Sequence, residues 1–274
     1  MSNFRTSVTQ QMGVYGQTLI KQNTMKSIAS IIAVLLVVAS CTSPEKSAMD
    51  HYRELNQEDA PNTLASLEEE QGWELLFDGT SPGAWRGYNM DSIPDGWIIE
   101  DGAFKVTTRG KGENLGIITG EEYGSFALSL ECKLTEGANS GLIYQVKEDT
   151  AYRFPYETGP EFQILDHANW SGSLEKWQIM GANYAMYPPK AEPFREVGEW
   201  NHLVLIVDGN TVTQILNGEV VVEYEKYSDD WNERRNSGKW EQFPDWGKFD
   251  TGHIALQNHG SVVWFRDIKI KELD

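Results

Sequence analysis

Two segments of the chain place acid, amide and imidazole side chains at alternating positions, the spacing that puts them on one face of a β-strand. In the first segment, Glu161, Gln163 and Leu165 alternate with Phe162 and Ile164. Because successive strand residues point to opposite faces, the two apolar residues would face a core, and the carboxylate and amide would share the other face. Any half-exposed strand shows the same alternation, so a solvated face without function is the competing interpretation.

The second segment places Gln257 and His259 on one face and Leu256 on the other, and it ends at Gly260. A carboxylate and an imidazole on neighbouring strands would form a general acid/base pair oriented by two amides, as proton abstraction or glycosidic chemistry requires. Histidine suits this role because it titrates near neutral pH. Glu161 and His259 are therefore the predicted catalytic residues. The same pair could instead bind a divalent metal, since both are common ligands.

Aromatic side chains form the other chemical signal, with ten Trp and eleven Tyr in the chain. Flat aromatic faces are good platforms for the apolar face of a sugar ring. The irregular segment 169–196 contains Trp170, Trp177, Tyr184 and Tyr187, and long loops between strands usually shape sites. The candidate donors to substrate oxygens are Lys190, Arg195 and Arg266, although such residues are more often simply surface or salt-bridge residues.

The elements that must position these residues are strands joined by turns. An Asp101-Gly102 hairpin signal follows one apolar run, and residues 202–224 read as a three-stranded antiparallel meander. About ten to twelve short strands over roughly 200 residues predict an all-β fold, a β-sandwich or jelly roll in one domain. The absence of an internal repeat in the sequence argues against a propeller. Further strands are expected at residues 73–77, 97–100, 103–106, 125–134, 142–146, 161–165, 253–257 and 262–273.

Composition excludes several classes of protein. The chain has 274 residues, 40% of them hydrophobic, which is enough for one sizeable core. Its formal net charge of −18 is opposite to the basic surface that nucleic-acid binding requires, so no nucleic-acid partner is expected. Cys41 and Cys132 are too few for a disulfide framework.

The N-terminal region indicates a destination in the cell envelope. An apolar run from residue 28 to residue 40 follows Lys26 and is shorter than the roughly 20 residues that span a bilayer, which favours a signal-peptide core over residues 1–40. The run ends Val38-Ala39-Ser40-Cys41, which resembles the lipobox of bacterial lipoproteins and implies a lipidated Cys41. We expect a periplasmic or outer-membrane lipoprotein that contacts the membrane through its lipid anchor only. The alternative is an ordinary cleaved signal peptide with an incidental cysteine.

Two further boundaries are predicted near the N-terminus. Met25 resembles the true initiator, which would make residues 1–24 a mis-assigned start. Residues 41–71 are polar and acidic and read as a tether, with a short helix over residues 64–70 capped by Asn62 or Thr63. The predicted catalytic domain is then residues 72–274.

Six separated blocks occur in the order found in one known family and cover the chain from about Thr63 to its C-terminus. They are GWELLFDGTSPGAWRGY, GWIIEDGAFKV, NSGLIYQV, GPEFQILDH, GEWNHLVLIVDGNTVTQILNGEVVVEY and GHIALQNHGSVVWFRDIKI. Together they resemble the 3-keto-disaccharide hydrolase family, formerly described as a domain of unknown function. The resemblance implies a concanavalin A-like jelly roll of two antiparallel sheets, in secreted or lipid-anchored bacterial proteins that process carbohydrate.

The resemblance also implies site residues. The family's Pro-Glu-x-Gln strand matches Pro160, Glu161 and Gln163, with Asp166 at its end, and its Leu-Gln-x-His-Gly element matches Gln257, His259 and Gly260. The other matching positions are Asn139, Ser140 and Gly141, the loop tyrosine Tyr184, and the pair Phe265 and Arg266. The implied substrate-binding residues are Gln163, Gln257, Arg266, Tyr184, Asn139 and Asp166. The stretch Asp229–Asp250 is longer and more aromatic than the family pattern, and we expect it to alter the rim of the site.

The implied substrate is an oligosaccharide or glycoside oxidised at C3. A ketone at C3 acidifies the hydrogen on C2, so a base can remove it before the C1 group leaves by β-elimination and water adds to the enone. Glu161 or His259 would be the base, and the other would be the acid or a metal ligand, with Gln163, Gln257 and Arg266 as donors. Two alternatives remain: a non-catalytic sugar-binding module, and a conventional glycosidase whose second carboxylate is Asp166, Glu157 or a loop acid.

Overall fold

The structure is a computed structural model that describes residues 46–55, 60–107 and 116–273. The expected signal peptide (1–40), the start at Met25 and the lipidated Cys41 lie outside the described residues. No helix within the described ranges is both long enough and apolar enough to cross a membrane.

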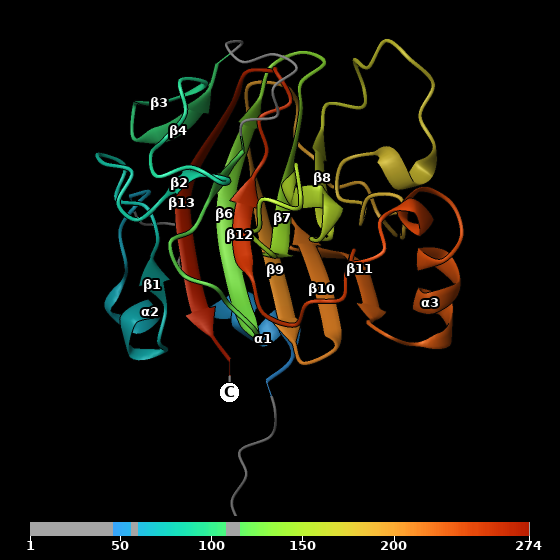
Figure 1. The fold of residues 1–274 in the computed structure, drawn as a ribbon. Coiled ribbons are helices and arrows are strands. Elements are labelled where there is room, and N and C mark those ends of the chain that lie inside the picture. The colour runs from blue at the N-terminus through green and yellow to red at the C-terminus, as the bar shows by residue number, and fades with distance from the viewer. Residues whose placement is uncertain (1–45, 56–59, 108–115, 274) are drawn as a thin grey trace, which may run out of the picture. The chain divides into compact units, whose positions relative to one another are not determined.

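Two antiparallel sheets form the body of residues 45–274 (Figure 1). The larger sheet has eight strands in the order β11-β10-β9-β6-β13-β4-β3, and β1 pairs with β13. Its strands are β1 (Glu74–Leu75), β3 (Trp97–Glu100), β4 (Ala103–Val106), β6 (Phe126–Leu134), β9 (Trp200–Asp208), β10 (Thr211–Leu216), β11 (Glu219–Glu225) and β13 (Val263–Glu272). The smaller sheet has the order β2-β5-β12-β7-β8. Its strands are β2 (Arg86–Gly87), β5 (Ile117–Ile118), β7 (Asn139–Val146), β8 (Glu161–Leu165) and β12 (His253–Leu256).

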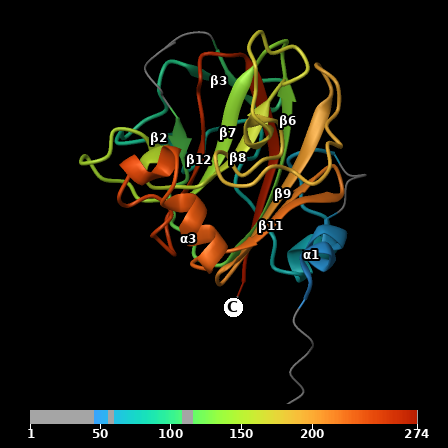
Figure 2. The same ribbon diagram turned by 90° about the vertical axis from the view of Figure 1, so that its right-hand side faces the viewer.

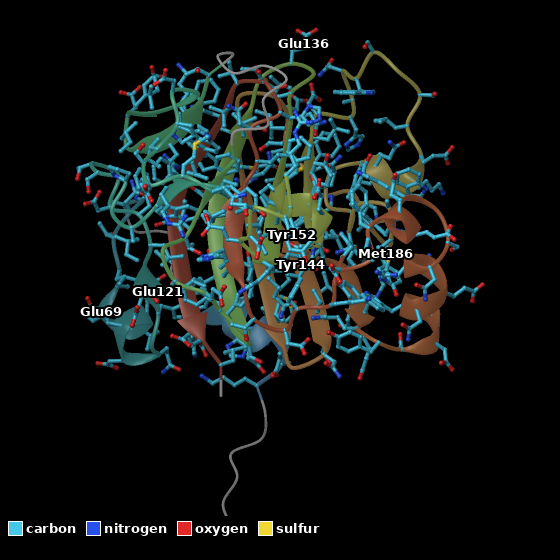
Figure 3. All side chains as sticks on the ribbon, in the orientation of Figure 1. Glu69, Glu121, Glu136, Tyr144, Tyr152 and Met186 are labelled. Carbon is cyan, nitrogen blue, oxygen red and sulfur yellow. The ribbon has the colours of Figure 1, made fainter. Side chains whose placement is uncertain are left out.

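The core lies between the two sheets. Phe162 and Ile164 of β8 and Tyr144 of β7 pack there against residues of the larger sheet such as Leu205 and Phe265. Figure 3 shows Tyr144 among the strands, whereas the acidic side chains of the surface project into solvent. The all-β fold and its two-sheet jelly-roll architecture are therefore confirmed, and burial of these apolar faces is the main force that holds the sheets together.

The hairpins form where turn residues allow them. Asp101 and Gly102 join β3 to β4 with positive φ values of 52° and 75°, and Asn217 and Gly218 join β10 to β11 with 47° and 88°. Two successive positive φ angles match the twist of the flanking strands, which is why Asp-Gly and Asn-Gly predict such turns. The predicted meander is thereby confirmed as β9, β10 and β11.

The N-terminal part of the described chain covers the outer face of the larger sheet (Figure 2). Helix α1 (Ala48–Glu54) packs with Trp73 against β9 and β10. In α2 (Ser66–Glu70), Glu68 forms a buried ion pair with Lys269 of β13 at 3.0 Å. Residues 46–55 and 60–71 thus belong to the folded body, which differs from the expected tether because these apolar and paired side chains find partners on the sheet.

The start of α2 also differs from the sequence-based expectation. Ala65 precedes the helix, and its N–H donates to the Glu68 carboxylate at 2.9 Å, so Glu68 supplies the cap expected from Asn62 or Thr63. Asn62 has a positive φ of 61° and instead exchanges two hydrogen bonds with Asp267, at 2.9 and 2.8 Å. Its side chain therefore ties this turn to β13.

The remaining helices are short and flank the smaller sheet. Helix α3 (Asp229–Arg235) and the 3₁₀ helix η3 (Lys239–Gln242) lie in the segment between β11 and β12. The other two 3₁₀ helices are η1 (Pro155–Glu157) and η2 (Lys176–Gln178). Figure 2 shows α3 on the side of the smaller sheet and α1 on the side of the larger one.

Candidate functional site

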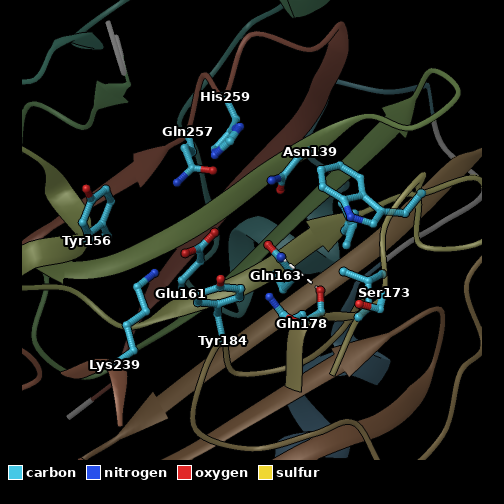
Figure 4. A pocket seen from close by; sticks show the side chains of 13 residues that line it. Asn139, Tyr156, Glu161, Gln163, Ser173, Gln178, Tyr184, Lys239, Gln257 and His259 are labelled. Atoms are coloured by element: carbon cyan, nitrogen blue, oxygen red, sulfur yellow. Dashed lines mark hydrogen bonds between the residues drawn. The ribbon is translucent and has the colours of Figure 1, made fainter. Parts of the chain in front are cut away.

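A cavity of about 320 Å³ lies on the outer face of the smaller sheet, the face opposite the core (Figure 4). Its floor comes from β7, β8 and the residues after β12, and its walls come from η1, the segment 170–184 and η3. This volume is near the lower end of the range for small-molecule sites.

Strand β8 supplies the central polar side chains. Glu161, Gln163 and Leu165 line the cavity, whereas Phe162 and Ile164 are buried in the core. The alternation predicted from the sequence is therefore confirmed. Both polar side chains are nearly buried, with 5% of Glu161 and 3% of Gln163 exposed, so the site is not a solvated strand face.

The segment after η2 continues the sheet along the free edge of β8. Gln163 donates its N–H to the carbonyl of Ala182 at 2.9 Å, and Tyr184 donates its N–H to the carbonyl of Glu161 at 2.9 Å. The Gln163 side chain also donates to the carbonyl of Gln178 at 3.1 Å. These bonds bring Tyr184 into the cavity beside Glu161, which explains how a residue on an irregular segment is held in place.

Gln257 is held by the start of β7. Ser140 donates its hydroxyl to the Gln257 carbonyl at 2.6 Å, and the Gln257 N–H donates to the carbonyl of Gly141 at 2.9 Å. The Asn-Ser-Gly block therefore continues the pairing of β7 beyond the end of β12 and fixes the backbone from which the side chain of Gln257 enters the cavity.

His259 lies two residues further on and is exposed at the rim of the cavity. The turn that follows is held by the Asn258 side chain, which accepts the N–H of Gly260 at 2.9 Å. Figure 4 shows His259 and Gln257 on one side of the cavity, and Glu161 on the other. Two segments almost a hundred residues apart thus bring the predicted acid and imidazole to one cavity.

The electrostatics of the site centre on Glu161. Burial raises the pKa of its carboxyl to about 7, an effect that the positive charge of Lys239 partly offsets. Burial likewise lowers the pKa of the Lys239 amine, with the Glu161 charge acting in the opposite direction. A carboxyl that titrates near neutral pH is suited to accept and return a proton.

Four of the predicted substrate-binding residues line the cavity, namely Asn139, Gln163, Gln257 and Tyr184. Asp166 does not: its carboxylate accepts the N–H of Gly137 at 2.8 Å and the side-chain amide of Asn169 at 3.0 Å. These bonds close the turns at the end of β8, so Asp166, predicted as a substrate-binding residue, lies outside this cavity.

Arg266 also lies elsewhere. It belongs to β13 in the larger sheet, where its guanidinium pairs with Glu131 at 2.7 Å and stacks 3.9 Å from the ring centroid of Trp200. Its alternation along β13 points it to the outer face of the larger sheet, away from the cavity. Arg266, expected as a substrate-binding residue, therefore does not line this cavity.

Some of the loop aromatic residues line the cavity, and others pack against neighbouring side chains. Trp170 lines the cavity, whereas the Trp177 ring contacts that of Tyr184 edge-on at 5.7 Å. Tyr187 stacks on Tyr224 and donates to Asp230 at 2.8 Å. The other two candidate donors do not line the cavity: Lys190 is exposed, and Arg195 donates to the Trp200 carbonyl at 2.8 Å.

Several lining residues were missed by sequence reasoning: Lys239, Tyr156, Gln178, Ser173 and Leu174. Lys239 matters most among them, because it brings a positive charge into the cavity that acts on Glu161. Lys239 belongs to the long aromatic stretch Asp229–Asp250, which was expected to alter the rim of the site. The sequence did not predict that this stretch would place a lysine in the cavity.

The residues that could hold a divalent metal were predicted to be Glu161 and His259. Both line the cavity, but no group of three or more His, Cys, Asp or Glu side chains suited to a metal ion occurs in the described part of the chain. Gln163, Gln257 and Asn139 would have to complete any coordination sphere there, and amide oxygens favour hard cations.

Comparisons with known proteins show what the chain is similar to. The sequence profile of the 3-keto-alpha-glucoside-1,2-lyase-like domain matches residues 72–271. A 3-keto-disaccharide hydrolase of Bacteroides thetaiotaomicron is 29% identical over 276 residues, covering 87% of this chain and 95% of the relative.

Two crystal structures from Parabacteroides distasonis, each described as a candidate glycosyl hydrolase, share the fold. The first is 38% identical with a TM-score of 0.74 and covers 78% of this chain and 100% of the other. The second is 27% identical with a TM-score of 0.57 and covers 73% and 99%.

Proposed function

The chain belongs to the family of 3-keto-alpha-glucoside-1,2-lyase-like domains, and on that premise we propose that it cleaves 3-keto-glycosides in the cavity of its smaller sheet. The observation that carries the proposal is Glu161: a nearly buried carboxyl with a pKa of about 7 that faces a cavity of sugar-binding size. The 3-keto-disaccharide hydrolase of Bacteroides thetaiotaomicron supports the substrate class.

Glu161 is the base that removes the C2 hydrogen. The C3 ketone makes that hydrogen acidic, and a base whose pKa lies near the working pH combines a large ionised fraction with a strong affinity for the proton. The electron pair released from the C2–H bond moves onto the C3 oxygen and then returns to expel the group at C1, which gives an enone.

His259 protonates the departing oxygen. It lies at the exposed rim, where the aglycone would leave the cavity, and histidine is the side chain that most often serves as a general acid or base. Water then adds to the enone: its oxygen bonds to C1, His259 takes up the proton that this water loses, and a proton returns to C2, so the net reaction is hydrolysis of the glycosidic bond. Glu161, protonated in the first step, is placed to return that proton.

The amides and aromatic rings orient the sugar. Gln163, Gln257 and Asn139 present their side chains to the cavity from β8, from the residues after β12 and from β7 (Figure 4). Amides suit this task because each offers both donors and an acceptor to sugar hydroxyls. Trp170 and Tyr184 also line the cavity and supply flat apolar faces.

The test compares wild type with Glu161→Gln on paired intact and 3-oxidised glucosides, with and without a chelator. We expect wild type to cleave only the oxidised glucosides, and Glu161→Gln to be slower by about 10² to 10⁴-fold because general-base catalysis is lost. Glu175→Gln is the matched control, since Glu175 is exposed and does not line the cavity.

Three results would contradict the proposal. Binding of intact glycan without any product would identify a sugar-binding module. Cleavage of unoxidised glucosides that depends on Glu157 would identify a conventional glycosidase with two carboxylates. Full activity of Glu161→Gln on the oxidised glucosides would remove Glu161 as the base.

We further propose that the protein is anchored by lipid at Cys41 in the bacterial cell envelope. The short apolar run ending in Val38-Ala39-Ser40-Cys41 supports this location. Expression of full-length protein with a radiolabelled fatty acid is expected to label wild type but not Cys41→Ala. Release of unlabelled wild type into the medium would contradict the anchor.

A further inference from the structure

Lys239 brings a positive charge into the cavity from η3. Its Nζ atom lies over three aromatic rings, at 4.2 Å from the centroid of Tyr184, 4.5 Å from Trp240 and 5.3 Å from Tyr156. Figure 4 shows the ammonium pointing toward the same part of the cavity as Glu161. Such rings attract a cation through their negative faces, so this cage favours the protonated form of the amine.

The position of Lys239 is fixed by the segment that carries it. Trp240, the next residue, donates its indole N–H to the Tyr184 carbonyl at 3.1 Å and stacks on Trp246 with ring centroids 4.5 Å apart. At the base of the segment, the buried ammonium of Lys226 donates to the Gln145 side chain at 2.9 Å. It also donates to the Phe249 carbonyl at 3.0 Å and to the Asp250 carboxylate at 2.9 Å. The segment is thus tied both to the sheet and to the wall of the cavity.

The donors of Lys239 have no acceptor within the described residues, in contrast to the other buried lysines. Lys226 is saturated by the bonds just described, and Lys269 donates to both carboxylate oxygens of Glu68 at 3.0 Å. Lys239 forms no hydrogen bond or ion pair through Nζ with any described group. Because a half-buried ammonium without acceptors is costly, a ligand that supplies one would bind there favourably.

Glu161 does not fill this role, although it lies in the same cavity. No ion pair joins the two side chains in the part of the chain that the structure describes, yet the charge of each alters the pKa of the other. Opposite charges that face one cavity without touching leave room for a small polar group between them. In a 3-keto sugar, the C2–H bond and the C3 carbonyl oxygen are adjacent groups of this kind.

We propose that Lys239 is a further catalytic residue, which donates a charged hydrogen bond to the C3 oxygen of the substrate while Glu161 removes the C2 proton. This inference rests on the proposed function. The electron pair of the C2–H bond becomes charge on the C3 oxygen, and the ammonium stabilises that charge without giving up its proton. A fixed donor directed at developing charge typically accelerates such a step by about 10² to 10³-fold.

The test measures exchange of the C2 hydrogen in D₂O, together with kcat and KM, on a 3-keto-glucoside. For Lys239→Met we expect both exchange and kcat to fall by about 10² to 10³-fold, with KM changed much less, because the interaction strengthens only in the transition state. Lys239→Arg keeps a charged donor and is expected to retain about a tenth of the rate or more. Lys176→Met, which changes an exposed lysine of η2, is the control and is expected to behave as wild type.

The outcomes separate this inference from the proposed function. If wild type neither cleaves the 3-keto-glucoside nor exchanges its C2 hydrogen, the proposed function fails and this role fails with it. If wild type is active and Lys239→Met exchanges equally fast, only the role of Lys239 is overturned. Thermal unfolding checks that each variant is folded, and Lys239→Gln replaces Lys239→Met if the latter is not.

A covalent role for the amine is the remaining outcome. If Lys239 instead formed an imine with the C3 ketone, cyanoborohydride would add the mass of the reduced sugar to Lys239, and Lys239→Arg would be as inactive as Lys239→Met. That result would overturn the hydrogen-bonding role. We expect no such adduct at Lys239, because the three aromatic faces and the charge of Glu161 oppose the loss of the proton that burial favours.

Discussion

A Cβ atom on residue 141 would lie 2.2 Å from Oε1 of Glu161, so the carboxylate occupies space that Gly141 leaves free. Gly141 lies on β7, opposite Gln163 of the neighbouring β8. The Asn-Ser-Gly block therefore has two functions in the site. Its Ser140 hydroxyl and Gly141 carbonyl hold Gln257, and its glycine leaves room for the Glu161 carboxylate on the cavity floor.

The first prediction concerns this close approach. Gly141→Ala is expected to lower kcat about a hundredfold, because the methyl group displaces the Glu161 carboxylate, and to destabilise the fold by about 1–3 kcal/mol through overpacking. Steady-state kinetics and denaturant unfolding measure the two effects. Gly124→Ala is the control, since its added Cβ meets only a turn of Thr251 and Asp250 remote from the cavity. Combined with Glu161→Gln, Gly141→Ala should cause little further loss of activity; two fully additive losses would contradict this account.

The second prediction is that activity and stability respond to pH in opposite directions. The pKa of Glu161 is raised from 4.5 to about 7 in the folded protein. Between these values the folded chain retains a proton that the unfolded chain has released, so the free energy of unfolding falls as pH rises through this window. The decrease in the free energy of unfolding is complete above about pH 7 and amounts to about 3 kcal/mol at most.

Glu161→Gln isolates this contribution because it cannot titrate. Relative to wild type, it is expected to gain stability as pH rises from 4 to 8, while losing activity throughout. For wild type, kcat/KM should rise with pH through about 7, where the base becomes ionised. Urea unfolding of both proteins across this range provides the measurement, and a stability difference that is constant with pH would show that Glu161 has an ordinary pKa.

Sequence reasoning succeeded for the strands, where alternation with a period of two residues determines the face on which each side chain lies. The alternation around Phe162 and Ile164 was enough to predict that Glu161 and Gln163 share the other face of β8. Asp-Gly and Asn-Gly pairs likewise predicted the hairpins, because few other residues accept two positive φ angles in succession.

The same reasoning could not decide which sheet a strand joins. Arg266 alternates correctly along β13, but β13 pairs with β6 and β4 in the larger sheet, so its polar face looks away from the cavity. Lys239 was missed for the converse reason. It comes from an irregular segment with no period, and tertiary contacts such as that of Trp240 with Tyr184 bring it to the site.

A third prediction follows from the position of Arg266. Arg266→Gln is expected to leave kcat/KM on a 3-keto-glucoside within about twofold of wild type. It should lower stability by about 1 kcal/mol or less, since it removes a partly exposed ion pair with Glu131 and a stacking contact on Trp200. Kinetics and thermal unfolding test both values. A hundredfold loss of activity in a variant of normal stability would return Arg266 to the site.

The last prediction concerns the attachment of the segment that carries Lys239. The Lys226 side chain is fully buried and donates to Gln145 at 2.9 Å, to the Phe249 carbonyl at 3.0 Å and to Asp250 at 2.9 Å. Lys226→Met removes these bonds and takes the donor from the buried side-chain oxygen of Gln145, which is expected to cost about 2 kcal/mol. Because the bonds close the base of the segment, the loss should be local and should free η3 to move.

Hydrogen exchange distinguishes this local effect from general destabilisation. In Lys226→Met, amides of α3 and η3 should exchange faster while those of β9 and β10 keep their protection, and kcat should fall because Lys239 is no longer held over Tyr184. Lys248→Met, a change of an exposed lysine in the same segment, serves as the control. Uniformly faster exchange in both sheets, with kcat per folded molecule unchanged, would show that Lys226 stabilises the fold without positioning Lys239.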